Sequence, residues 1–500
     1  MRRLTNRFSF TAYIAHAGWA LLLVCIVSAC SDSDVPVELD YVPVSADVSP
    51  REVKAFGHEL IRVEADRSLF RESSVVTIHG HAIYDYTVES PRIATFRWQG
   101  APDEQVAIDV ETGGTTYRIE NALAVSQPAH PAFERMVSLG ASFGQGVISQ
   151  SFDLDSQIHA PSAQLARAAG AYFPLPLTKR GYIPSIDPED FDEQCREVGY
   201  EPKMEDSIGR ILEVFSTPEG RMQPWALRKD PHLQTRNAAV GGSVLGGIVH
   251  GALNQGEQEA IMFLEHFVYD PFVDWTGFFQ RPGPGSQLDY VASLNPTMAM
   301  LVDTIGNDVL PGLGGGFDVD RIAGDEYFRE HYSELFARLG KDTWVFIADT
   351  PDITTLPRVK SRRTARLEAG EPAEEVDARI AAIKVRINEI NDILAEVTAD
   401  YPRAVIVPFS KLVDDMTDGA MVFGGQEYSF ANFGGFISLD HLHLTRTGYA
   451  VLADLFVEHM NLHLGTDIPA IDVDAIALAD PLSPAKLAEH GLSPEACPGN

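Results

Sequence analysis

Residues 138–146 read S-L-G-A-S-F-G-Q-G and place one serine, Ser142, between two kinds of predicted local structure. The apolar run R-M-V-S-L at 135–139 is typical of a short buried strand, and a helical pattern follows at 160–170. The letters G-A-S-F-G also fit G-x-S-x-G, a pattern in which a sharp strand-to-helix turn exposes a serine hydroxyl. Ser142 is therefore a candidate nucleophile, although a serine that precedes a helix is also a common N-cap.

The chain beyond this serine alternates short apolar runs with amphipathic segments, which indicates an α/β domain with a parallel sheet. The runs expected to be strands are 297–305, 342–351 and 403–409. A long helix with Ile, Val and Leu at three- and four-residue spacing is predicted at 376–397, and another at 447–464. Polar and glycine-rich insertions interrupt this core.

A nucleophilic serine needs a base, a group that orients the base and donors for the oxyanion. The glycine-rich oxyanion loop that accompanies G-x-S-x-G in α/β-hydrolases is absent upstream of Ser142. Near the C-terminus, S-L-D-H-L-H-L at 438–444 instead places Asp440 three residues before His443, just ahead of a predicted helix. This spacing brings the carboxylate within reach of the imidazole.

Four segments in order now resemble the boxes of the SGNH, or GDSL-type, hydrolase family. They are G-A-S at 140–142, N-A-A-V-G-G at 237–242, I-G-N-D at 305–308 and D-H-L-H at 440–443. The resemblance covers residues 135 to about 463. It implies a three-layer α/β/α, flavodoxin-like domain with a parallel sheet and no metal or organic cofactor.

The resemblance also implies a role for each matched residue. Ser142 matches the nucleophile, His443 the base and Asp440 the acid that orients it. The backbone N–H groups of Ser142 and Gly242 and the side-chain amide of Asn307 match the three oxyanion donors. Three converging neutral donors suit a developing oxyanion.

Two positions depart from the family pattern. Ala141 stands where the first box has Asp, and we expect altered loop packing there with catalysis retained. Ile305 stands where the third box has its first glycine, with Gly306 one place later, a change expected to tilt Asn307. Of the polar neighbours, Asp308 is interpreted as structural and His441 as a bystander, with chance metal binding by D-H-L-H as the alternative.

The N-terminal part is expected to direct export. Residues 1–29 combine a basic start with a short apolar run, as in a signal peptide, and V-S-A-C resembles a bacterial lipobox. That resemblance implies lipid attachment at Cys30 and, with Ser31 following, an outer-membrane lipoprotein. A tether at 30–50, a small β-rich domain at 51–130, the hydrolase domain at 131–470 and a tail at 471–500 complete the predicted organisation.

The β-rich domain is expected to act as a spacer or packing partner, with carbohydrate binding left open. Cys195 and Cys497 either pair in an oxidising compartment or remain separate thiols. The formal net charge of −32 argues against nucleic acid as a partner, because an acidic surface repels phosphates.

The predicted function is a membrane-anchored serine esterase or lipase whose partners are an ester substrate and the membrane. The alternatives are a carbohydrate O-deacetylase of the same fold and a non-catalytic surface-binding lipoprotein.

Overall fold

The structure is a computed structural model that describes residues 41–178, 184–200, 203, 228–230, 233–250, 286–314 and 316–497. The chain forms two units, Met1–Val42 and Pro43–Asn500, and only Tyr41 and Val42 of the first unit are described. The predicted signal peptide, Cys30 and the first part of the predicted tether therefore lie outside the described residues.

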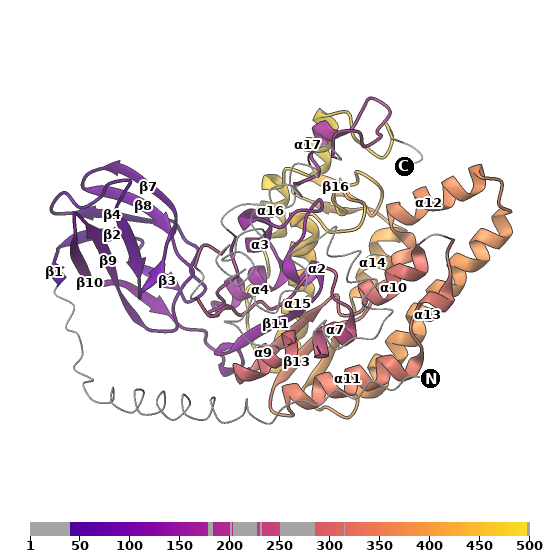
Figure 1. Ribbon diagram of the computed structural model, residues 1–500, viewed down its shortest axis with the longest axis horizontal. Helices are drawn as coiled ribbons and strands as arrows, with labels where there is room; N and C mark the ends of the chain where they lie inside the picture. The colour runs from indigo at the N-terminus through magenta and orange to yellow at the C-terminus, as the bar shows by residue number, and fades with distance from the viewer. Residues whose placement is uncertain are drawn as a thin grey trace, which may run out of the picture. The chain divides into compact units, whose positions relative to one another are not determined.

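The N-terminal part of the second unit is β-rich and contains two sheets (Figure 1). One sheet is antiparallel and runs in the order β2 (Ala46–Ser49), β4 (Ile61–Ala65), β8 (Ile93–Arg97) and β7 (Tyr84–Ser90). The other contains β10 (Thr115–Ser126), β9 (Gln105–Thr112), β5 (Val75–Ile78) and β6 (His81–Ala82), with β3 (Glu52–Lys54) parallel to β10. Alternate residues are buried, as in a sheet with one face in a core.

The sequence carries the signal of one hairpin here, whereas β1 (Tyr41–Pro43) and β2 lie in the stretch that is predicted to be a tether. Strands β9 and β10 pair antiparallel across Gly113 and Gly114, and a glycine pair between two alternating segments predicts such a hairpin. Strand β2, in contrast, falls inside the stretch assigned to a tether. Its Ser and Asp residues face outward while Val48 is buried, so its composition reads as a linker although it pairs with β4.

The second part of this unit is a mixed α/β structure with a four-stranded parallel sheet. Its order is β11 (Met136–Gly140), β12 (Met298–Val302), β13 (Trp344–Ala348) and β14 (Ala404–Val407). Every residue of β11 and β12 is buried, which explains why these strands are continuous apolar runs. The parallel α/β core predicted from the sequence is thus confirmed at this level.

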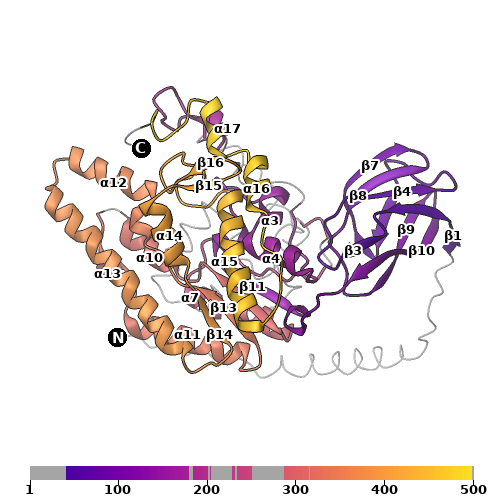
Figure 2. The same ribbon diagram turned by 180° about the vertical axis from the view of Figure 1, so that it is seen from behind.

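The strand order determines which face of the sheet the connecting helices cover. Each strand is the neighbour of the one before it, and right-handed crossovers then place successive connecting helices on one face. The helices α9 (Gln287–Ser293), α11 (Asp325–Leu339) and α13 (Ala373–Thr398) contact one another in that sequence. Helix α15 (Arg446–Leu464) packs against α4 (Pro161–Ala169) instead and lies in front of the sheet in the reverse view (Figure 2).

Short elements complete the part of the chain that carries the candidate site. They are α2 (Ser142–Gln145), α3 (Leu154–Ile158), α7 (Leu245–His250), α10 (Gly306–Leu313), α12 (Pro357–Glu368), α14 (Phe409–Asp418), β15 (Met421–Phe423) and β16 (Gln426–Tyr428). The region predicted as a tail contains α16 (Val473–Ala479) and α17 (Pro484–Glu489). Among the described residues, we find no helix with the length and apolarity needed to cross a bilayer.

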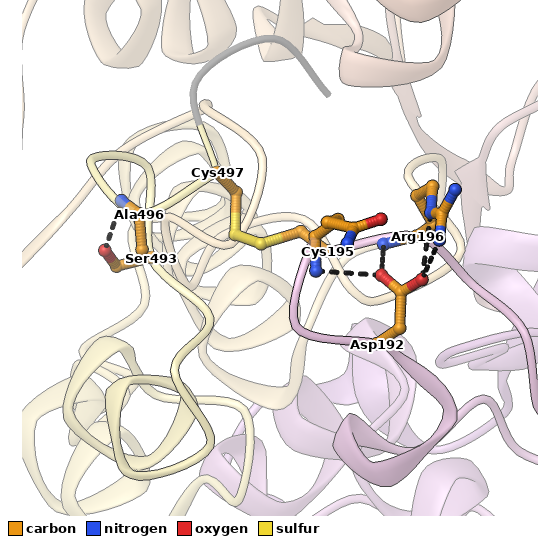
Figure 3. Close-up of a disulfide and its surroundings, with 7 residues drawn as sticks. Asp192, Cys195, Arg196, Ser493, Ala496 and Cys497 are labelled. Atoms are coloured by element: carbon orange, nitrogen blue, oxygen red, sulfur yellow. Dashed lines mark hydrogen bonds and ion pairs between the residues drawn. A yellow bond between two sulfur atoms is a disulfide. The ribbon is translucent and has the colours of Figure 1, made fainter.

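A disulfide joins two distant parts of this chain (Figure 3). Cys195 and Cys497 are 302 positions apart in the sequence, and their Cα atoms lie 5.8 Å apart. Around it, Arg196 pairs with Asp192 at 2.6 Å, and the Ala496 N–H donates to Ser493 Oγ at 3.1 Å. Of the two readings left open by the sequence, the structure therefore shows the paired one.

Candidate active site

The turn between β11 and α2 presents Ser142. Gly140 has a φ of +137°, and a Cβ at this position would lie 1.8 Å from the carbonyl oxygen of Val302, so only glycine fits. Ala141 is the N-cap and makes no side-chain cap, while Ser142 is the first residue of α2. The N-cap interpretation of Ser142 is therefore wrong, because its Oγ donates a hydrogen bond to Asp303 Oδ2 at 3.3 Å.

The predicted acid–histidine pair is formed. His443 Nδ1 lies 2.6 Å from Asp440 Oδ2 in a loop that ends where α15 begins. A carboxylate only accepts hydrogen bonds, so Nδ1 must carry the hydrogen of this bond. In the neutral ring, Nε2 is then left with a lone pair, as a base requires.

Local hydrogen bonds fix the Asp440 carboxylate. Oδ1 accepts the backbone N–H groups of Leu442 at 3.0 Å and His443 at 2.8 Å, and Oδ2 also accepts the N–H of Gln150 at 2.7 Å. Burial alone would raise the pKa of Asp440. The charge interaction with His443 and these hydrogen bonds outweigh burial and hold the pKa well below its usual range. Asp440 is therefore an anion able to orient the imidazole.

His443 and Ser142 lie in one buried region. The Phe143 ring, next to the serine, has its centroid 5.7 Å from that of His443 and 6.0 Å from that of Tyr449. Within the part of the chain that the structure describes, Ser142 Oγ and His443 form no direct hydrogen bond. The serine hydroxyl instead bonds Asp303, whose charge interacts with His443.

Asp303 was missed by the sequence analysis. It follows the last residue of β12, and its carboxylate accepts hydrogen bonds from Ser142 Oγ and from the Phe143 N–H at 3.5 Å. Burial is the largest influence on this group and raises the pKa of Asp303 to about 6, against the charge of His443 and the hydrogen bonds. The usable signal was an acidic residue at the carboxyl end of a buried parallel strand, where sites of α/β folds gather.

The three predicted oxyanion donors differ in their surroundings. The N–H of Ser142 and that of Gly242 have no acceptor among the described residues, and Gly242 has a φ of +78°. Asn307 Nδ2 donates one hydrogen to the Ser243 carbonyl at 3.1 Å, which leaves its second hydrogen available. Ser142 and Asn307 line one pocket, whereas Gly242 is not among the residues that line it.

Polar side chains connect the 237–243 loop to the serine turn. Asn237 Nδ2 donates to the Gly144 carbonyl at 2.9 Å, and Gln145 Oε1 accepts the Gly241 N–H at 2.7 Å. Gln287 Nε2 bonds both the Gly140 carbonyl and Ser243 Oγ at 3.0 Å. These amides, which the sequence analysis also missed, hold the two loops in register.

The pocket beside Ser142 is mainly apolar. It extends from Ser142, Asp303 and Asn307 toward α14 and the 437–444 loop, and it is partly open to solvent. Its apolar lining comprises Phe143, Leu310, Pro351, Ile353, Leu356, Phe409, Val413, Phe430, Ile437, Leu442 and Leu444. Thr350 and two acids, Asp349 and Asp352, also contribute to the wall.

Asp308 and His441, which adjoin the candidate site residues in the sequence, have different surroundings. Asp308 Oδ2 accepts the Leu245 N–H at 2.9 Å and Oδ1 accepts the Tyr327 hydroxyl at 2.8 Å, in agreement with a structural role. His441 is packed against Phe191 and Phe433. Among the described residues, no group of three or more His, Cys, Asp or Glu side chains could hold a metal ion.

Comparisons with known proteins leave the family undetermined. No family model matches the chain, and no curated protein matches it. Among solved structures, the chain is similar to a protein described as a novel carbohydrate acetylesterase from Xanthomonas citri, with 9% identity over 83% of this chain and 73% of that chain. The TM-score is 0.28, too low to transfer fold or function.

Proposed function

We propose that the protein is a serine hydrolase of carboxylic esters with Ser142 as nucleophile, His443 as base and Asp440 as orienting acid. The observation that carries the proposal is the buried His443–Asp440 pair at 2.6 Å, near a turn from which Ser142 lines an apolar pocket. The finer assignment to SGNH-type hydrolases rests on the four boxes in the sequence.

In this mechanism, His443 Nε2 takes the proton of Ser142 as Oγ attacks the ester carbonyl. The carbonyl oxygen becomes an oxyanion, and the N–H of Ser142, the N–H of Gly242 and the second hydrogen of Asn307 are the proposed donors to it. His443 then gives its proton to the leaving alcohol, and water hydrolyses the acyl-serine by the same steps. An ionised Asp440 stabilises the imidazolium throughout.

The apolar wall favours an ester with an apolar acyl chain over an acetyl group. Leu310, Ile353, Leu356 and Val413 offer aliphatic contacts that a two-carbon acyl group would leave largely unused. A carbohydrate O-deacetylase would use the same serine chemistry, so acyl-chain length separates the two functions.

The test combines labelling with a substrate series. A fluorophosphonate probe is expected to label the parent protein and not Ser142→Ala, and p-nitrophenyl esters of two to twelve carbons are expected to be hydrolysed best beyond acetate. An unlabelled parent would favour the non-catalytic alternative. Equal rates of ester hydrolysis for the parent and Ser142→Ala would refute the proposal, and a sharp preference for acetate would select the deacetylase.

We further propose that Cys30 carries lipid and anchors the protein at the outer membrane, on the basis of the lipobox-like segment. Metabolic labelling with a radioactive fatty acid is expected to mark the parent and to leave Cys30→Ala unmarked. Label on both proteins, or on neither, would contradict this anchor.

A further inference from the structure

We infer that Asp303 is a catalytic residue of this site, whose ionised carboxylate positions the Ser142 hydroxyl and stabilises the imidazolium of His443 during attack. The inference rests on the proposed ester hydrolysis. It adds a second carboxylate to the predicted triad.

Asp303 accepts hydrogen bonds along the middle of the nucleophile turn. The Asp303 carbonyl accepts the Ala141 N–H at 3.1 Å, and its carboxylate accepts the Ser142 hydroxyl and the Phe143 N–H. Three successive residues of the turn are therefore bonded to Asp303. Ala141 contributes no polar side chain to this arrangement.

The backbone conformation at Asp303 and the glycine at residue 306 accommodate this carboxylate. Asp303 itself has a φ of +59°, a left-handed conformation that residues other than glycine seldom adopt. Gly306 lies against it, and a Cβ at residue 306 would be 2.1 Å from Asp303 Oδ1. The glycine that appears shifted in I-G-N-D thus makes room for the Asp303 carboxylate, and its N–H is a further donor to that group.

The charges around Asp303 point to a role in stabilising the imidazolium that forms when His443 takes the serine proton. In the described part of the chain, no Lys or Arg forms an ion pair with Asp303, and the protonated form of His443 is the cation that lowers its pKa. Asp440 lies on the Nδ1 side of His443, the Tyr449 hydroxyl is held neutral by burial, and Asp349 stands on the pocket wall. A pKa of about 6 leaves Asp303 largely ionised at neutral pH.

The proposed step balances without further reactants. The proton of Ser142 moves to His443 Nε2, the Oγ electron pair forms the bond to the carbonyl carbon, and the carbonyl π pair moves onto oxygen. Asp303 releases its hydrogen bond and keeps its negative charge, now facing an imidazolium. It takes no proton, so collapse returns the proton from His443 to the leaving alcohol.

The test is Asp303→Asn, which keeps the shape and removes the charge. We expect kcat to fall about 10- to 100-fold, as when a hydrogen bond to an ionised group is lost, with KM within about threefold of the parent. The acidic limb of the kcat/KM profile should become shallower, because one group then titrates in place of two. Its midpoint should move down, since the Asp303 carboxyl, with a pKa of about 6, no longer contributes to the limb.

A matched control is Asp480→Asn, which removes the charge of a buried carboxylate that is bonded to the Thr447 N–H and hydroxyl and does not line the pocket. We expect it to lower thermal stability and leave the midpoint of the acidic limb in place. If Asp303→Asn does not fold, Gly306→Ala provides the second variant. Its Cβ displaces the carboxylate while Asp303 is retained, and it should lower kcat and shift the limb.

The outcomes separate this inference from the proposed function. A parent protein that is neither labelled by fluorophosphonate nor active on esters means that the proposed function fails. An active parent whose kcat and acidic limb are unchanged in Asp303→Asn, or in a folded Gly306→Ala, overturns the role of Asp303 alone.

Discussion

Ser142 Oγ donates a hydrogen bond to Asp303 Oδ2 at 3.3 Å, so the candidate nucleophile is bonded to a half-buried acid that follows a different strand. Ser142 follows β11 and Asp303 follows β12. The parallel pairing of Gly140 with Val302 brings the two strand ends together. Partial removal of the Asp303 carboxylate from water makes its ionisation cost free energy, and this cost makes a stability test possible.

We expect Asp303→Asn to gain stability relative to the parent as pH rises from 4 to 7. The folded-state pKa of Asp303 is about 6, above the unfolded value near 3.9, so its contribution is present below pH 4 and is lost as pH rises through 6. This rise in the pKa of Asp303 means that the free energy of unfolding of Asp303→Asn should increase by about 3 kcal/mol relative to that of the parent between pH 4 and pH 7. Urea unfolding of both proteins at pH 4 and pH 7 measures this change. If the difference in unfolding free energy between the two proteins is the same at both pH values, the pKa of Asp303 does not change on folding.

Asp440→Asn should reduce kcat by about two to four orders of magnitude, because an amide can no longer hold His443 in the required tautomer. The neighbouring His441→Gln variant is the matched control. His441 packs on Phe191 and Phe433 and is expected to leave kcat within about threefold of the parent. If both variants lose ester hydrolysis to a similar extent, the cause is a disturbed 438–444 loop and not the loss of the Asp440–His443 hydrogen bond.

Leu310→Trp should shift acyl preference toward acetate by filling the apolar pocket. Leu310 lines the pocket from α10, and the larger ring would occupy the volume available to a longer chain. The measurement is the ratio of kcat/KM for octanoate and acetate esters, which we expect to fall at least about tenfold. Leu462→Trp, at a site that is 73% exposed, should leave the ratio unchanged. An unaltered ratio in Leu310→Trp would place the acyl chain elsewhere.

Removal of the disulfide should destabilise the protein without changing the chemistry. The double variant Cys195→Ser/Cys497→Ser is expected to lose about 2–4 kcal/mol of unfolding free energy, since the cross-link restricts a long loop of the unfolded chain. A reductant should lower the melting temperature of the parent and not of the double variant. Equal sensitivity of both proteins to the reductant would show that the two thiols do not pair.

The sequence by itself determined the strands of the parallel sheet, the β9–β10 hairpin, and the local acid–histidine pair, because these depend on neighbours along the chain. Asp440 and His443 are three residues apart, and the apolar runs of β11 and β12 show their burial directly. Ser142 could be singled out in the same way, as a serine between a strand and a helix.

Only the tertiary structure decided what surrounds that serine. Asp303 is 161 residues from Ser142, and Gln287 is 147 residues from Gly140, so no local pattern relates them. The same holds for the pairing of Cys195 with Cys497. Sheet register brings such residues together, and burial then gives Asp303 a pKa that its sequence context does not predict. The I-G-N-D departure, which the sequence presents as a misplaced glycine, is the space that the Asp303 carboxylate requires.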